Sequence, residues 1–248
     1  MIIKRFIKVH PTNYSVQLIK NILTKKMQIE IWSDIVCPFC SIGKKRFEKA
    51  LLQSGTSDKV HIIWKSFQLN PFQKTEPGKS INQYLSEHKR ISLKEAESMN
   101  LYVTEMAYKE DLRFDFSKTV VANSFKAHQL LQLAKINNLQ NTVGDALFKA
   151  YFSDGKNIDD TSTLQQIGVA AGIKSEDLEN FTDNRSLADA VLNDIEEARQ
   201  LQISGVPFFV FNQKYAISGA REVNYFVQAL QVSLSEWQSE LVSKIETK

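Results

Sequence analysis

Cys37 and Cys40 are the residues whose type and spacing point most directly to chemistry, in the run Cys37-Pro38-Phe39-Cys40. They are the only cysteines among the 248 residues, too few for a scaffold held together by structural disulfides. Two thiols separated by one helical turn come close enough to oxidise to a small intramolecular disulfide. The spacing therefore predicts a redox pair, with half of a metal site as the competing interpretation.

The pair is expected at the first turn of a helix. Apolar and polar residues alternate over 27–31, which predicts a strand, and a helical run follows Cys40. Pro38 suits the first helical position because no N–H partner is needed there. The unpaired N–H groups of a helix N-terminus favour a thiolate at Cys37. Cys40, further inside the helix, is then expected to be the buried resolving thiol.

The segments that follow predict strands on both sides of a long helical stretch. Residues 60–65 alternate again, so strand, helix and strand form a βαβ unit. Helical periodicity dominates from about 76 to 182. A short apolar strand over 205–211 then turns into a partner strand at 215–218, and an amphipathic helix ends the pattern. The sequence thus predicts an α/β protein in three parts, namely a basic N-terminal extension (1–26), a βαβ-based domain (27–75 and 183–248) and a helical insertion domain (76–182).

This set of motifs resembles the DsbA family, and more narrowly its FrnE-like branch of thioredoxin-fold dithiol–disulfide oxidoreductases. The resemblance covers roughly 27–240 and rests on the strand–CPFC–helix entry, the second strand ending in Gln68-Leu69-Asn70-Pro71, the helical insert and Gly205-Val206-Pro207. It implies a thioredoxin fold with a large all-helical insertion domain. The implied activity is thiol–disulfide exchange or disulfide isomerisation on proteins through Cys37 and Cys40.

The resemblance also implies the rest of the site. Val206–Pro207 is expected to be a cis peptide facing the dithiol, with Pro207 against Cys37 and the Val206 backbone free to pair with an extended substrate. The implied apolar surface for substrate consists of Pro38, Phe39, Val206 and Phe208. Asp34, three residues before Cys37, is a candidate proton shuttle, with a turn or capping role as the alternative. Arg221 is expected at the rim.

Two departures from the periplasmic relatives modify these expectations. No histidine lies between the cysteines, so we expect a milder oxidant, an isomerase or a reductase. A second cysteine pair is absent, which excludes a thiol relay within one chain. The four histidines have no paired spacing, so no metal is expected, and His128 is interpreted as a satisfied core side chain. No cofactor is predicted beyond the redox-active disulfide itself. Glutathione is a candidate reductant for that disulfide.

Charge and hydropathy limit the partners. Residues 1–26 carry a net charge of +6, which leaves −3 for 27–248 when subtracted from the formal +3. The body therefore lacks the cationic balance of a nucleic-acid-binding domain. The sequence contains no stretch of 18 consecutive apolar residues, so it predicts no membrane span. We expect a cytoplasmic protein whose partners are unfolded or disulfide-containing proteins and a thiol reductant, with 1–26 as an upstream extension outside the fold.

Two other function classes stay open at this point. The first is a glutathione-dependent transferase or isomerase, similar to the kappa-class and 2-hydroxychromene-2-carboxylate isomerase relatives that share the fold. Those relatives generally lack the dithiol, which argues against this alternative. The second is a chaperone that binds unfolded peptides without redox turnover.

Overall fold

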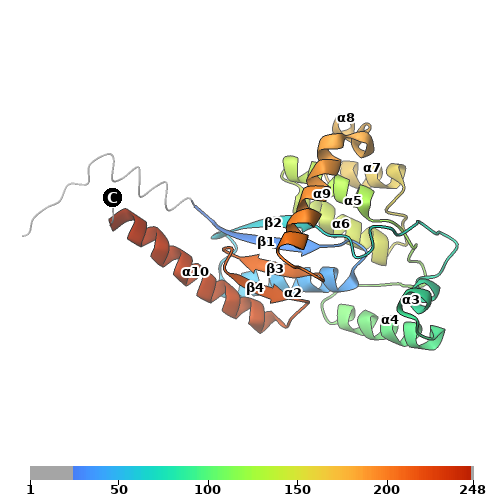
Figure 1. Ribbon diagram of the computed structural model, residues 1–248, viewed down its shortest axis with the longest axis horizontal. Coiled ribbons are helices and arrows are strands. Elements are labelled where there is room, and N and C mark those ends of the chain that lie inside the picture. Colours follow the sequence, from blue (N-terminus) through green and yellow to red (C-terminus); the bar gives the residue numbers. More distant parts are fainter. Residues whose placement is uncertain (1–24, 247–248) are drawn as a thin grey trace, which may run out of the picture.

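A four-stranded mixed sheet forms the centre of the protein in the computed structural model, which describes residues 25–246 (Figure 1). The strands are β1 (Met27–Ser33), β2 (Val60–Ser66), β3 (Phe208–Phe211) and β4 (Tyr215–Ser218), in the order β2-β1-β3-β4. β1 is parallel to β2 and antiparallel to β3, and β3 is antiparallel to β4. This is the predicted thioredoxin-like sheet, with the βαβ unit and the hairpin in the predicted order.

One face of the sheet is covered by α2 (Pro38–Ser54) and α10 (Val223–Glu246) (Figure 1). Phe47 of α2 is at the centre of this layer. Its ring lies 5.4 Å from the ring of Phe209, 6.2 Å from that of Phe211 and 5.8 Å from that of Phe226, between centroids. All four side chains are fully buried. This cluster anchors α2, and with it the cysteines, against the sheet.

The other face of the sheet carries α9 (Arg185–Gln200) (Figure 1). Trp32 of β1 packs there with Ala198 and donates a hydrogen bond from Nε1 to the backbone oxygen of Asp194 at 3.0 Å. The carboxylate of Asp194 accepts the backbone N–H of Ser66 at 2.9 Å and the side-chain amide of Gln132 at 2.6 Å. This buried acid therefore joins α9, the end of β2 and the insert.

A helical segment is inserted between β2 and β3, as predicted. Its helices are α3 (Ile81–Lys89), α4 (Leu93–Tyr108), α5 (Phe125–Ile136), α6 (Gln140–Phe152), α7 (Thr161–Ala170), α8 (Ser175–Leu178) and the short 3₁₀ helix η1 (Phe181–Asp183). Capping boxes start α3 at Ser80 and α4 at Ser92. The main apolar cluster of the insert also contains Cys37 and Cys40. The insert therefore packs directly on the dithiol.

Two element boundaries differ from the sequence prediction. β3 begins at Phe208 rather than at Gly205, because Pro207 has no N–H to offer the ladder. α10 continues past Trp237 to Glu246. Over the described residues, none of the helices combines the length and apolar character that crossing a bilayer requires. The predicted extension 1–26 lies almost wholly outside the described residues.

Replacing Phe47 by alanine should lower the free energy of unfolding by about 3–5 kcal/mol, because it leaves a cavity among three buried rings. Urea denaturation measures this change. Leu52→Ala, on the same helix but 76% exposed, is the matched control and should change stability by less than about 0.5 kcal/mol. Equal losses in the two variants would contradict the central place of the Phe47 cluster.

Candidate functional site

Cys37 occupies the N-cap of α2, and Cys40 lies one turn inside the helix. Cys37 has extended backbone angles, its side chain caps no N–H group, and Pro38 follows in the first turn. The Cys40 N–H donates to the Cys37 carbonyl at 3.0 Å. Both cysteines are free thiols and buried, with exposed fractions of 3% and 0%. The predicted helix start and the buried position of Cys40 are confirmed.

The loop before β3 lies against the cysteines. The Cys37 thiol donates a hydrogen bond to the Val206 carbonyl with a sulfur–oxygen distance of 3.6 Å, and the Val206–Pro207 peptide bond is cis. In this dithiol form the Cys37 thiol thus occupies the Val206 carbonyl, and pairing of the Val206 backbone with a substrate stays a prediction. The structure brings Val206, the residue before Pro207, into contact with Cys37 although the two are 169 positions apart in the sequence.

Gly43 allows this close approach. A Cβ atom at position 43 would lie 2.9 Å from Pro207 Cγ and 3.5 Å from Ala220, nearer to Pro207 than real Cβ contacts lie. Pro207 itself is held by its carbonyl, which accepts the Gly219 N–H at 2.8 Å. The turn after β4 is thereby drawn to the site, as expected for the rim. The exposed Arg221 hydrogen-bonds back to Ser218 in this turn.

The two thiols lie in different electrostatic surroundings. Burial raises the pKa of the Cys40 thiol well above its ordinary value, and its contact with Cys37 raises it further. The Ser33 side chain and a backbone hydrogen bond from Asp34 act in the opposite direction and are smaller. Cys40 therefore holds its proton at neutral pH and has to lose it before it can act as a nucleophile.

Asp34 is fully buried in the turn between β1 and α2. Its carboxylate accepts the backbone N–H of Leu69 at 2.8 Å and that of Val36 at 3.4 Å, and it lies 3.3 Å from His128 Nε2. Its carbonyl accepts the Cys37 N–H at 3.1 Å. Asp34 thus joins the cysteine turn to the segment after β2 and to the insert.

His128 is the main site residue that sequence reasoning missed. It is 1% exposed on α5, with Nε2 on Asp34, but Nδ1 has no hydrogen-bond partner within residues 25–246. The interpretation of His128 as a satisfied core side chain is therefore wrong for Nδ1. Nearby Tyr151 is also buried, and burial followed by the charge of Asp34 raises the pKa of its hydroxyl. Only the fold brings these residues to Asp34.

The residues predicted to contact substrate differ in how far they are exposed. Phe39 is 39% exposed beside the cysteines, and Pro38 and Val206 are half-buried. Phe208 is half-buried too and packs, like Val206, against the cluster of Trp32 and Ala198 under α9. Across residues 25–246, no group of three or more His, Cys, Asp and Glu side chains is arranged to hold a metal ion.

Comparison with known proteins gives concordant results. The family described as DSBA-like thioredoxin domain matches residues 28–231. A probable DsbA oxidoreductase from Streptomyces coelicolor is 33% identical, with a TM-score of 0.80 over 85% of this chain and 91% of that one.

Two further relatives are more distant. A putative protein disulfide isomerase from Nitrosomonas europaea has a TM-score of 0.65 at 13% identity, covering 86% of this chain and 99% of that one, and shows the fold alone. The uncharacterized protein YwbO of Bacillus subtilis is 24% identical over 207 residues, which is 82% of this chain and 96% of that protein.

Asp34→Ala should lower the free energy of unfolding by about 2–4 kcal/mol, because the Leu69 N–H and the buried His128 Nε2 lose their acceptor. Chemical denaturation measures the change. Asp58→Ala removes an exposed carboxylate and is expected to cost less than about 0.5 kcal/mol. A stability equal to that of Asp58→Ala would show that Asp34 does not hold the turn.

Gly43→Ala should destabilise the protein even though alanine is the better helix former, because its methyl group meets Pro207 at 2.9 Å. Overpacking of this kind costs about 1–3 kcal/mol. Gly144→Ala is the control for stability, since its Cβ would meet only Leu131 at 3.8 Å. Thermal unfolding of both variants compares them, and a Gly43→Ala melting temperature at or above that of the wild type would refute the close approach.

Proposed function

The chain belongs to the family of DSBA-like thioredoxin domains, and from this premise we propose that it exchanges disulfides in protein substrates through the Cys37–Cys40 dithiol, with Cys37 as the nucleophile. The observation that supports this proposal most strongly is the position of Cys37 at the N-terminus of α2, without a side-chain cap and one turn before Cys40. A narrower placement in the FrnE-like branch is part of this proposal.

The assignment of Cys37 as the nucleophile follows from the asymmetry of the two thiols. Cys37 lies at the N-terminus of α2, the end of a helix that favours negative charge. Cys40 is deeper, and the rise in the pKa of its thiol keeps it protonated. An incoming disulfide therefore meets the more nucleophilic sulfur first, next to the exposed ring of Phe39.

Two exchange steps complete the reaction when the protein acts as a reductant. The Cys37 thiolate attacks one sulfur of a substrate disulfide, forms a mixed disulfide and releases the other sulfur as a thiolate. After Cys40 has lost its proton, its thiolate attacks Cys37 Sγ. The second substrate sulfur then leaves, and the protein holds the Cys37–Cys40 disulfide. The reverse sequence oxidises a substrate dithiol.

Pro38, Phe39 and Val206 are proposed to contact the substrate, because they are the accessible apolar groups around Cys37. Phe208 supports Val206 from the α9 side, since both pack against the Trp32 cluster. The three donors around the Asp34 carboxylate support the positioning role that the sequence left open beside proton transfer. A cytoplasmic location, with glutathione as reductant, is proposed from the sparse use of cysteine.

Insulin reduction with dithiothreitol as the electron donor tests the proposed function. The wild type should accelerate the precipitation of reduced insulin, and Cys37→Ser should abolish this activity. Cys40→Ser should form mixed disulfides that it cannot resolve, so its turnover should fall by more than about tenfold. Wild-type activity in Cys37→Ser would contradict the proposal.

The same variants separate the alternatives. If Cys40→Ser keeps glutathione-dependent activity on small molecules and the wild type does not reduce insulin, the protein is a transferase or isomerase instead. Equal suppression of aggregation by the wild type and the double serine variant, without redox turnover, would identify a chaperone. A glutathione redox titration of the Cys37–Cys40 couple then ranks oxidase, isomerase and reductase roles, because about 30 mV corresponds to about 1.4 kcal/mol.

A further inference from the structure

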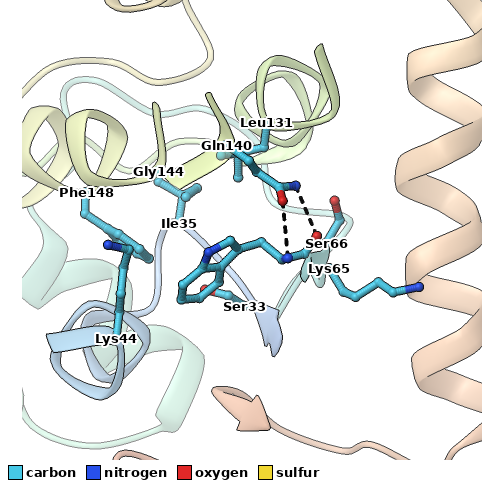
Figure 2. A pocket seen from close by; sticks show the side chains of 10 residues that line it. Ser33, Ile35, Lys44, Lys65, Ser66, Leu131, Gln140, Gly144 and Phe148 are labelled. Atoms are coloured by element: carbon cyan, nitrogen blue, oxygen red, sulfur yellow. Dashed lines mark hydrogen bonds between the residues drawn. The ribbon is translucent and has the colours of Figure 1, made fainter. Parts of the chain in front are cut away.

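Two buried cations follow the cysteines on α2, and they face different parts of the protein. Lys44 is 2% exposed, lines a small cavity (Figure 2) and pairs with Asp145 of α6 at 2.7 Å. Arg46 is 6% exposed and lies two positions further along, on another side of the helix. Because a buried charge is costly unless it is paired, the partners of Arg46 show which segments it joins.

The guanidinium of Arg46 joins α2 to two distant segments. Its Nε donates to Glu110, just after α4, at 2.7 Å, and its Nη1 donates to the Ala220 carbonyl at 2.8 Å. Glu110 is 7% exposed and pairs also with Lys49 of α2 at 2.8 Å. Glu222, 2.8 Å from the same Nη1, has a side chain that is 69% exposed. The pair with Glu110 is therefore the one shielded from solvent.

Ala220 lies in the turn that holds the Pro207 loop. The N–H of the neighbouring Gly219 donates to the Pro207 carbonyl at 2.8 Å. Gly43 lies about one helical turn before Arg46, and a Cβ atom there would lie 2.9 Å from Pro207 and 3.5 Å from Ala220. The turn after β4 and the Pro207 loop thus pack together on one part of α2, and Arg46 fastens the turn there through its carbonyl.

This chain of contacts ends at the expected nucleophile. Val206 precedes Pro207, and its carbonyl accepts the hydrogen bond of the Cys37 thiol at 3.6 Å. A peptide that pairs with the Val206 backbone therefore meets Cys37 at a place that the loop sets. Because the rate of a reaction between bound groups depends steeply on their placement, a residue that fixes the loop affects the exchange from a distance.

We propose that Arg46 is a positioning residue for the first exchange step. By holding the Ala220 carbonyl, it fixes the Pro207 loop beside Cys37, so that the disulfide of an extended peptide docks within reach of the thiolate. The inference rests on the proposed function, because it needs a substrate disulfide that Cys37 attacks. Arg46 acts through the loop and not on the reacting sulfurs. Its pair with Glu110 makes the end of α4, and with it the insert, part of the support of this loop.

Two probes with the same leaving group test this role. Each is a mixed disulfide of thionitrobenzoate, one with mercaptoethanol and the other with the single cysteine of a short unstructured peptide. The Cys37 thiolate forms a bond to the mercaptoethanol or peptide sulfur, and thionitrobenzoate leaves as a coloured thiolate. Only the peptide probe has a backbone that can pair with Val206. The ratio of the two second-order rate constants therefore measures what the loop contributes.

Arg46→Met should lower the rate constant with the peptide probe on the order of tenfold, and leave that with the mercaptoethanol probe within about twofold of the wild type. Arg46→Lys keeps the positive charge, but its one nitrogen cannot take the places of both Nε and Nη1. Its rate constant with the peptide probe should therefore fall between those of the wild type and Arg46→Met. Arg46→Lys also provides the test if Arg46→Met does not fold.

Two control variants should keep the wild-type ratio. Lys44→Met removes a similarly buried cation from the same helix, but one that pairs with Glu48 and Asp145. Glu222→Gln removes the exposed carboxylate beside Arg46 Nη1, and an exposed ion pair contributes little. Stopped-flow absorbance of the released thionitrobenzoate measures all variants as reduced full-length protein.

A loss confined to the peptide probe and to the Arg46 variants would support the proposal. A wild-type rate constant with the peptide probe in Arg46→Met, or in Arg46→Lys if Arg46→Met does not fold, would overturn it. Equal losses with both probes would also overturn it, because Arg46 would then act on the thiol or on the fold as a whole. So would an equal loss in Lys44→Met. Failure of the wild type to release thionitrobenzoate from either probe would contradict the proposed function instead.

Discussion

The start of α2, where Cys37 lies beside the first backbone N–H groups of the helix, is the feature on which the whole site depends. A serine or aspartate at an N-cap would pair with them and stabilise the helix by about 0.5–2 kcal/mol. Here Cys37 occupies that position, and its side chain caps no N–H group. The helix is instead secured elsewhere, by the Phe47 cluster on the sheet side and by the buried Arg46, which pairs with Glu110 at 2.7 Å and with the Ala220 carbonyl at 2.8 Å.

The insert determines how the two sulfurs differ. Leu131 and Phe148 belong to its helices and to the cluster that contains Cys40, so the insert contributes to the burial that raises the pKa of the Cys40 thiol. His128 of the same insert contacts Asp34, whose carbonyl in turn holds the Cys37 N–H. The helical segment therefore belongs to the candidate site as well as to the protein surface, since it contributes to the burial of Cys40 and contacts the turn that holds Cys37.

Much of the fold could be predicted because its signals are local. Alternation over 27–31 and 60–65 indicated the parallel strands, and the turn residues before Tyr215 indicated the hairpin. Asn212 and Gln213 adopt positive φ values in that turn, a conformation that asparagine accepts readily. The start of β3 was harder to place, because apolar character continues through Gly205-Val206 although Pro207 cannot join the ladder.

The sequence by itself determined the chemistry of the protein: two thiols one helical turn apart, a proline in the first turn, and strands that direct both towards one end of a sheet. The tertiary structure alone decided which groups surround those thiols. The contacts of Cys37 with Val206, of Asp34 with His128, and of Gly43 with the Pro207 loop join residues 94 or more positions apart. Periodicity and capping are properties of neighbouring residues, whereas burial and charge at a thiol arise from whichever distant segments pack around it. The difference between the two sulfurs is therefore a property of the folded chain.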